Sequence, residues 1–202
     1  MIVRAARVLF GIHGYSATTV TMVAQEAGMS FQAVYYHFRG IEDIYDAVVA
    51  DVAARLEQPV REVFAQPTLQ KQIRTYVFAM HTLDYEDRTV MAFMIREYLD
   101  ARRDRQRDKG PLVEGTERFF VALVKSAITR GELPPDSDLP AIVGVLTSVM
   151  WGVGLYAGFV DDPDEMARVT DAVDGMIAHG LPWASSRSER AQPVPGTARR
   201  PR

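Results

Sequence analysis

The sequence contains no cysteine, which excludes disulfide bonds and metal sites built from thiolates. Histidine is scarce as well, and the four that occur, His13, His37, His81 and His179, are too scattered to indicate a metal site. We also find no nucleophile paired with a base, no cluster of metal ligands and no phosphate-binding loop. The sequence therefore predicts a protein that is not an enzyme and that needs no cofactor and no metal ion.

Positive charge is the next shortage. The 202 residues carry a net charge of −3. The first fifty residues hold three basic and four acidic side chains, namely Arg4, Arg7, Arg39, Glu26, Glu42, Asp43 and Asp46. This balance gives no basic patch of the kind expected where a protein binds nucleic acid. Arg4 and Arg7 also interrupt the N-terminal apolar residues, so no signal peptide is visible and a cytoplasmic protein is expected.

What the sequence does contain is a strong helical pattern between Thr19 and Phe38. Apolar residues recur at the spacing i, i+3, i+4 and i+7, which marks one face of a helix: Val20, Val23, Ala24 and Ala27. Thr19 can cap the start of this helix, and Gly28 can adopt the left-handed backbone that often ends one. We therefore predict a short helix followed by a tight turn.

A second short helix should begin after Ser30, which can cap it. Its inner face would hold Val34 and Phe38, with Gln32, Ala33, Tyr36 and His37 projecting the other way. Two packed helices of this kind form a helix-turn-helix, whose second helix fits the major groove of DNA. For any single residue of the pattern, a glycine turn between two core helices is the alternative interpretation.

The whole segment resembles the DNA-binding domain of the TetR family of bacterial repressors over residues 3–50. The resemblance is carried by Leu9-Phe10, Gly14-Tyr15, Thr18-Thr19, Ala27-Gly28, Ser30 and Tyr35-Tyr36-His37-Phe38. It implies DNA contacts from Thr19, Thr21, Ser30, Phe31, Gln32, Ala33, Tyr36 and His37. Two features depart from the family. Ile41 stands where a lysine is usual, and the chain starts almost at the first helix, so an arginine-rich arm is either absent or lies upstream.

The remaining chain is predicted to be helical as well. We expect helices at residues 3–13, with Val8, Leu9 and Ile12 inward, and at 41–64, where Pro59 should kink or end the helix. Further helices are expected at 69–83, 86–103, 112–130, 139–160 and 164–179. The predicted fold is all-α. A helix-turn-helix domain over residues 1–47 continues into a helical ligand-binding and dimerisation domain over 48–183, followed by a disordered tail over 184–202.

The run from Leu139 to Val160 carries no charge and is long enough to cross a membrane. Acidic residues flank it on both sides, however, and Trp151 falls in its middle. A helix buried in a protein core or in an interface between subunits is therefore favoured. The resemblance implies a dimer interface built from the last two helices. Its expected members are Gly144, Ser148, Gly152, Leu155, Met166, Val169 and Val173. The prediction is a homodimer with no membrane attachment.

An apolar pocket is expected among the middle helices, because small-molecule sites combine apolar walls with a few polar groups. Its candidate lining is Tyr76, Met80, His81, Phe93, Met94, Tyr98, Phe119, Phe120, Met150 and Trp151. His81, Tyr98 and Arg96 are the polar groups expected to orient a ligand. For each of these residues singly, plain core packing is the competing interpretation.

The function implied by the resemblance is that of a homodimeric transcription regulator. We expect a repressor that a small apolar or aromatic effector releases from a pseudo-palindromic operator in double-stranded DNA. The alternative is a helical small-molecule-binding protein whose DNA binding is weak or lost, which the acidic N-terminal segment and Ile41 favour.

Overall fold

The structure is a computed structural model that describes residues 1–103, 109–157 and 163–178. The regular elements within these ranges are helical, which confirms the predicted all-α fold. They are α1 (Ile2–His13), the short 3₁₀ helix η1 (Tyr15–Ala17), α2 (Val20–Glu26), α3 (Phe31–His37), α4 (Ile41–Phe64), α5 (Leu69–Glu86), α6 (Arg88–Arg103), α7 (Pro111–Thr129), α8 (Leu139–Ala157) and α9 (Pro163–Ala178). The predicted tail at 184–202 lies outside the described residues.

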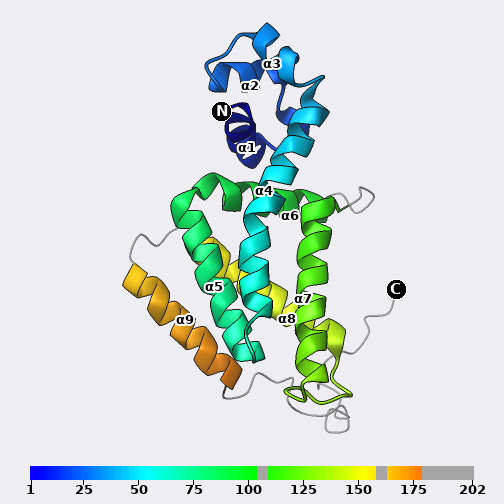
Figure 1. The fold of residues 1–202 in the computed structure, drawn as a ribbon, viewed down its shortest axis with the longest axis vertical. Helices are drawn as coiled ribbons and strands as arrows, with labels where there is room; N and C mark the ends of the chain where they lie inside the picture. Colours follow the sequence, from blue (N-terminus) through cyan, green and yellow to red (C-terminus); the bar gives the residue numbers. More distant parts are fainter. Residues whose placement is uncertain (104–108, 158–162, 179–202) are drawn as a thin grey trace, which may run out of the picture.

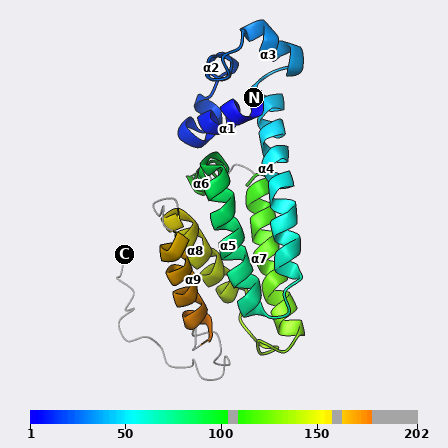
Figure 2. The same cartoon turned by 60° about the vertical axis from the view of Figure 1, so that its left-hand side comes forward.

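The helices form a small head and a larger body. Helices α1, α2 and α3 make the head, and α4 runs from the head down into the body (Figure 1). In the body, α4 and α7 lie on one side and α8 and α9 on the other, with α5 between them (Figure 2). Helix α6 lies under the head, where it packs against α1. The head therefore rests on the body through α1 and α6 and is joined to it by α4.

The predicted capping residues and the predicted glycine form the turn between α2 and α3. The Thr19 hydroxyl accepts a hydrogen bond from the Met22 backbone N–H at 3.3 Å, and the Ser30 hydroxyl accepts one from the Ala33 N–H at 3.2 Å. Gly28 has a φ of 63°, the left-handed conformation that glycine adopts without steric cost. Val34 is fully buried, so α3 is held by its inner face and leaves its outer face free.

The predicted buried face of α1 is wrong at two of its three residues, Val8 and Ile12. Ile12 is 62% exposed and Val8 is half-buried, whereas the buried apolar residues are Ile2, Ala5, Ala6, Leu9 and Phe10. This stripe follows the helical spacing that faces α4 and α6. The error arose because Val8 and Ile12 extend the apolar stripe sideways, and the sequence does not show which edge is covered.

Pro59 does not end α4, which continues to Phe64. A proline inside a helix removes one backbone hydrogen bond, but the chain on either side stays helical here. Two apolar clusters hold the molecule together. One joins the head to the upper parts of α4, α5 and α6, and the other fills the body between α5, α7 and α8.

Candidate functional site

The predicted DNA-contact residues gather on α3 and on the start of α2. Thr19, Thr21 and Ser30 are exposed at the N-terminal ends of the two helices. On α3, Gln32, Tyr36 and His37 are exposed and Ala33 is half-buried. Tyr36 is 87% exposed, which is unusual for a large ring in a folded domain. The side chains named from the sequence therefore share one outward surface.

A pair of aromatic rings borders this surface. Phe31, the first residue of α3, and Tyr35 one turn later are each 45% exposed. Their ring centroids lie 4.5 Å apart with the planes inclined at 52°. Tyr35 was not predicted as a contact residue, although the i, i+4 spacing from Phe31 could have indicated the pair.

The head exposes little positive charge. Of the three arginines in residues 1–50, Arg4 and Arg39 are exposed, but Arg7 is buried with 1% exposure. Arg7 cannot reach a DNA phosphate from this position. The four acidic residues of the first fifty, Glu26, Glu42, Asp43 and Asp46, are all exposed.

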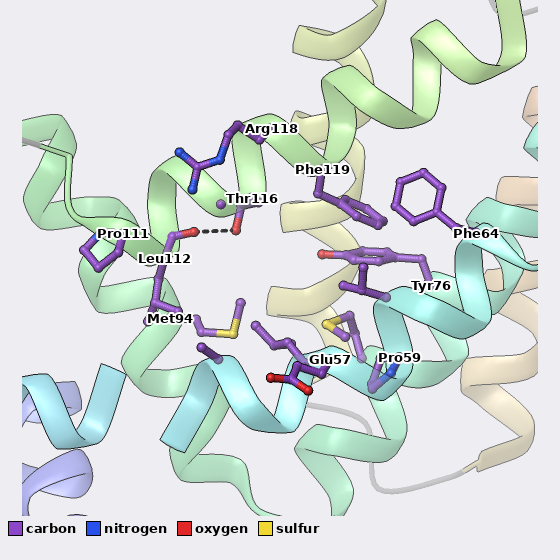
Figure 3. Close-up of a pocket in the computed structure, with 15 residues that line it drawn as sticks. Glu57, Pro59, Phe64, Tyr76, Met94, Pro111, Leu112, Thr116, Arg118 and Phe119 are labelled. Carbon is purple, nitrogen blue, oxygen red and sulfur yellow. Dashed lines mark hydrogen bonds between the residues drawn. The ribbon is translucent and has the colours of Figure 1, made fainter. Parts of the chain in front are cut away.

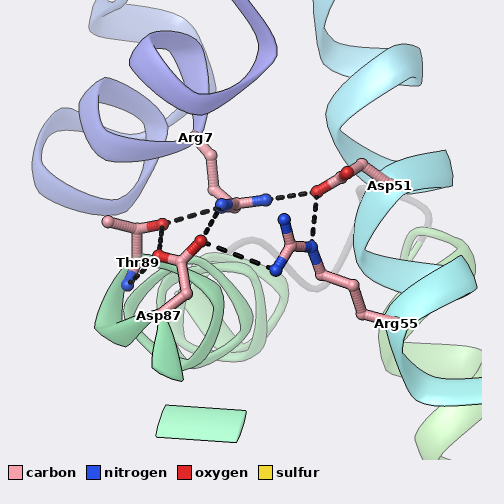
Figure 4. A network of polar contacts seen from close by, with 5 residues as sticks. All are labelled: Arg7, Asp51, Arg55, Asp87 and Thr89. Atoms are coloured by element: carbon pink, nitrogen blue, oxygen red, sulfur yellow. Dashed lines mark hydrogen bonds and ion pairs between the residues drawn. The ribbon is translucent and has the colours of Figure 1, made fainter. Parts of the chain in front are cut away.

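Arg7 instead joins the head to the body (Figure 4). Its guanidinium forms ion pairs with Asp51 on α4 and with Asp87, and its Nε donates to the Thr89 hydroxyl at 2.8 Å. Arg55 also bridges the two carboxylates, at 3.1 Å from Asp51 and 3.6 Å from Asp87. Two cations and two anions thus meet where α1, α4 and the start of α6 converge. Sequence reasoning missed this network, because its partners lie 44 and 80 residues from Arg7.

The network changes the titration of Asp87. Burial alone would raise the pKa of this carboxyl, but hydrogen bonds from Thr89 and the positive charges of Arg7 and Arg55 outweigh it. The pKa of Asp87 is therefore lower than its ordinary value. The carboxylate is held in its charged form at neutral pH.

Further contacts fix α1 on α6. Arg96, which was predicted to orient a ligand, donates instead to the backbone carbonyls of Ile12 and His13 at 3.4 and 3.3 Å. Its guanidinium lies against Gly14, where a Cβ would meet Arg96 Nη2 at 2.7 Å and the φ is 78°. The positive φ requires glycine at this position, whereas the contact is with the flexible end of the Arg96 side chain, which could move aside. Tyr45 on α4 also donates a hydrogen bond to Glu97 on α6.

The body contains an apolar cavity of about 520 Å³ between α4, α5, α6 and α7 (Figure 3). Its lining is mainly apolar and comprises Ala53, Leu56, Glu57, Pro59, Val60, Phe64, Tyr76, Met80, Met94, Pro111, Leu112, Gly115, Thr116, Arg118 and Phe119. This volume lies within the range of pockets that bind small molecules.

A few polar groups line the cavity. The Tyr76 ring stacks on Phe119 with centroids 5.3 Å apart, and its hydroxyl points toward the cavity interior (Figure 3). Burial raises the pKa of this hydroxyl, so it stays protonated and can donate a hydrogen bond. The Thr116 hydroxyl donates to the Leu112 carbonyl at 2.9 Å. Arg118, which is exposed, pairs with Glu114 at 3.2 Å.

Four of the ten predicted pocket residues line this cavity, namely Tyr76, Met80, Met94 and Phe119. The other six do not. Phe93 packs with Phe10 and Tyr45 beneath the head, and Phe120 and Met150 lie in the core of the body. Tyr98 stacks on Trp151 at 4.6 Å, and His81 is half-buried on α5.

Sequence reasoning missed the α4 wall of the cavity. Leu56, Val60 and Phe64 recur every four residues, which could have indicated one lining stripe on that helix.

Helix α8 has an apolar face that the described part of the chain leaves uncovered. Only 17% of the segment Leu139–Tyr156 is buried, although its length and composition would suffice to cross a membrane. Of the residues predicted at a dimer interface, Gly144, Ser148 and Gly152 are exposed and Leu155 is 48% exposed. On α9, Val169 is half-buried, Val173 is buried in the core of the body, and the side chain of Met166 lies outside the described residues. The Tyr156 hydroxyl donates to Glu165 at 2.6 Å and ties α9 to α8.

Within the described residues, no group of three or more His, Asp or Glu side chains could hold a metal ion. The site thus consists of a helix-turn-helix surface, a charged junction beneath it and an apolar cavity in the body.

Comparison with known proteins agrees with this arrangement. Residues 2–48 match the family model of the bacterial regulatory proteins of the tetR family. A curated relative, the HTH-type transcriptional regulator SrpR of Pseudomonas putida, is 26% identical over 190 residues, which span 92% of this chain and 84% of the relative.

Two solved structures share the fold. The fatty acid degradation regulator FadR from Bacillus halodurans aligns with a TM-score of 0.65 and 16% identity, over 90% of this chain and 95% of that chain. The regulator FadR from Bacillus subtilis, solved in complex with stearoyl-CoA, aligns with a TM-score of 0.65 and 15% identity, over 89% and 97%.

The fold and the matched segment define a helix-turn-helix transcriptional regulator, not an enzyme. The resemblance to the TetR family that the sequence predicted is confirmed, because residues 2–48 match that family's model and the curated relative is a regulator of the same type.

Proposed function

We propose that this protein is a homodimeric repressor that binds a pseudo-palindromic operator and leaves it when a small apolar molecule enters the body. The observation that carries this proposal is the joint presence of an outward-facing α3 and an apolar cavity, connected by one helix, α4. The reading domain corresponds to residues 1–47 and the ligand-binding and dimerisation domain to residues 48–183. A cytoplasmic location follows from a DNA partner in a bacterial regulator.

The operator is contacted by Thr19, Thr21, Ser30, Phe31, Gln32, Ala33, Tyr36 and His37. Their exposure on α3 and at the N-terminus of α2, which is partial for Ala33, supports this assignment. Backbone N–H groups and hydroxyls at helix N-termini suit phosphate oxygens, and they position the protein without reading sequence. Gln32 can pair bidentately with adenine in the major groove, so it supplies sequence information.

The dimer forms through α8 and α9 of two copies. The exposed Gly144, Ser148 and Gly152 support this, because small residues let two helices approach closely. Val145, Leu155 and Tyr156 are also 39–48% exposed and would otherwise leave apolar surface in water. A second copy covers this face in an isologous contact. A membrane would be the other apolar cover, and the fractionation of the wild-type protein distinguishes the two.

The effector is an apolar molecule that fills the cavity and offers an acceptor to the Tyr76 hydroxyl. The apolar walls and the length of the cavity along α4 support an acyl chain or an aromatic compound. The relative solved with stearoyl-CoA shares the fold, which makes a long-chain acyl thioester a suitable first probe. Of the residues expected to bind ligand, we keep Tyr76, Met80, Met94 and Phe119 in the proposed site. We add Leu56, Val60 and Phe64 of α4, which also line the cavity.

Induction works through α4. A molecule between α4 and α7 displaces α4, and the network of Arg7, Asp51 and Asp87 carries that displacement to the head. The two readers of a dimer must match half-sites spaced by whole helical turns, roughly 34–36 Å for one turn. A change in their separation weakens binding only if the effector prefers the altered spacing.

One observation favours a second candidate function, a helical small-molecule-binding protein without DNA affinity. Residues 1–50 expose two arginines against four acidic side chains, so the surface of this segment repels phosphates overall. A gel shift with the DNA that flanks the protein's own gene, performed at two salt concentrations, separates the candidates. A discrete complex supports the repressor. Ligand binding with no complex at either salt concentration supports the second candidate.

A further inference from the structure

The exposed aromatic pair on α3 stands out from the rest of the reading surface. Phe31 has no polar atom, yet it is 45% exposed on a helix whose inner face is fully buried at Val34. Tyr35 is exposed to the same extent and its ring lies 4.5 Å away, so the two rings form one continuous apolar surface. Leaving such a surface in water forgoes burial energy, which indicates that something covers it in the working complex.

The low charge of the head points in the same direction. Arg7 is buried between Asp51 and Asp87, which leaves Arg4 and Arg39 as the exposed cations among residues 1–50. Phosphate neutralisation normally supplies much of the affinity of a DNA reader. A reader with so few exposed cations has to gain its affinity and its specificity from uncharged contacts.

The position of the pair defines the group that it can meet. Phe31 is the first residue of α3, directly after the cap residue Ser30, and the N-terminal residues of a recognition helix contact base edges. The thymine methyl is the apolar group that unmodified bases present in the major groove, and aromatic side chains pack against it.

We propose that Phe31 and Tyr35 form an apolar clamp on the 5-methyl group of a thymine in each half-site. The inference rests on the proposed DNA-binding function and names what that surface reads. Gln32 lies next to the clamp on α3 and reads the neighbouring base pair through hydrogen bonds. The half-site therefore contains a thymine beside the position that Gln32 contacts.

The test uses the full-length chain and a duplex enriched from a random-sequence pool. Each thymine of that duplex is replaced singly by uracil, which keeps base pairing and removes only the methyl group. We expect one thymine per half-site at which uracil weakens binding about fourfold, and roughly fifteenfold when both half-sites are changed, from the burial of one methyl each. Fluorescence anisotropy measures both affinities.

Variants then tie the effect to the pair. Phe31→Ala should weaken binding to the thymine duplex and reduce the thymine-to-uracil ratio toward one, because only the Tyr35 half of the clamp remains. Phe31→Leu should retain part of the ratio. Ile12→Ala, which removes an exposed apolar side chain from α1, is the matched control and should leave the affinity and the ratio unchanged.

The possible outcomes distinguish the proposed repressor function from the thymine clamp. Enrichment of no sequence would overturn the proposed function and the clamp together. A specific complex that tolerates uracil at every position would overturn the clamp and leave the repressor intact. A uracil effect that persists unchanged in Phe31→Ala would also overturn it, since another side chain would then contact the methyl group.

Discussion

At the scale of single residues, the polar side chains at the N-terminal end of the chain differ sharply in exposure. Gln32, Tyr36 and His37 are exposed on α3, whereas Arg7 is buried although it lies in the same small head. An arginine near the start of a DNA-binding domain would ordinarily be assigned to phosphate contact. Here its two carboxylate partners make it a connector between head and body.

Gln32→Ala should relax sequence preference at one position in each half-site. The loss of a bidentate contact with adenine removes about 1–3 kcal/mol of discrimination against other bases. Affinities for a set of single-base operator variants measure this. An equal loss on every variant would show that Gln32 only positions the helix.

Asp87→Asn should lower the stability of the protein at neutral pH, and this loss of stability should become smaller in acid. Because the folded pKa of Asp87 is lower than its unfolded value near 3.8, its stabilising contribution is complete above that value and is lost as the pH falls through the folded pKa. The neutral-pH cost should be roughly 1–3 kcal/mol, as for a lost charged hydrogen-bond partner. Thermal unfolding of both proteins between pH 3 and 7 gives the comparison.

Asp84→Asn is the matched control for this titration. Burial is the main influence on Asp84 and raises its pKa, against the opposing charges of Arg88 and His81. The charged form is therefore disfavoured in the folded state, so this variant should gain stability relative to wild type as the pH rises through the carboxyl range. The same trend in both variants would contradict the account of the Arg7 network.

At the scale of helices, the pattern of apolar residues predicted most of the architecture. The starts of α2, α3 and α5 follow the capping residues Thr19, Ser30 and Thr68, and the ends of α2 and α7 precede Gly28 and Gly131, so these limits can be read from the chain. The end of α5 was predicted at residue 83, but the helix continues to Glu86. The covered edge of α1 and the continuation of α4 through Pro59 depend on packing against distant helices. Local signals carry no information about those neighbours.

The cavity was harder to predict than the reading surface for the same reason. The exposed face of α3 follows from the burial of Val34 on the opposite face, and the sequence of this one helix is enough to predict it. Cavity residues come from four helices, and an aromatic residue such as Phe93 fits core packing and pocket lining equally well until the helices are assembled.

Gly152→Leu should disrupt the dimer without harming the subunit. Among the described residues, no atom lies within 4 Å of a Cβ added at Gly152, so the larger side chain fits there and projects from α8. In an isologous interface it would be introduced twice. Light scattering should then report monomer or insoluble protein.

Ala54→Leu, on the exposed side of α4, serves as the control and should remain dimeric. A soluble dimer of unchanged mass in Gly152→Leu would place the interface elsewhere. Recovery of the wild-type protein in the membrane fraction would instead support lipid as the cover of α8.

At the scale of the whole molecule, the shortage of exposed cations in residues 1–50 predicts a weak dependence of DNA binding on salt. The proposed dimer would present Arg4 and Arg39 twice and so neutralise about four phosphates from this source. The slope of log K against log salt should be no steeper than about −4. A slope near −8 would show that basic residues outside the first fifty contact the phosphates.

The central claim is that α3 reads a defined sequence. It is tested most directly by measuring the affinity of the wild-type protein for its enriched duplex and for a scrambled duplex of equal length and composition, both at about 0.15 M salt. Specific sites are typically bound at least about a thousandfold more tightly than other DNA, and we predict a ratio of this size. Equal affinity for the two duplexes would contradict the account.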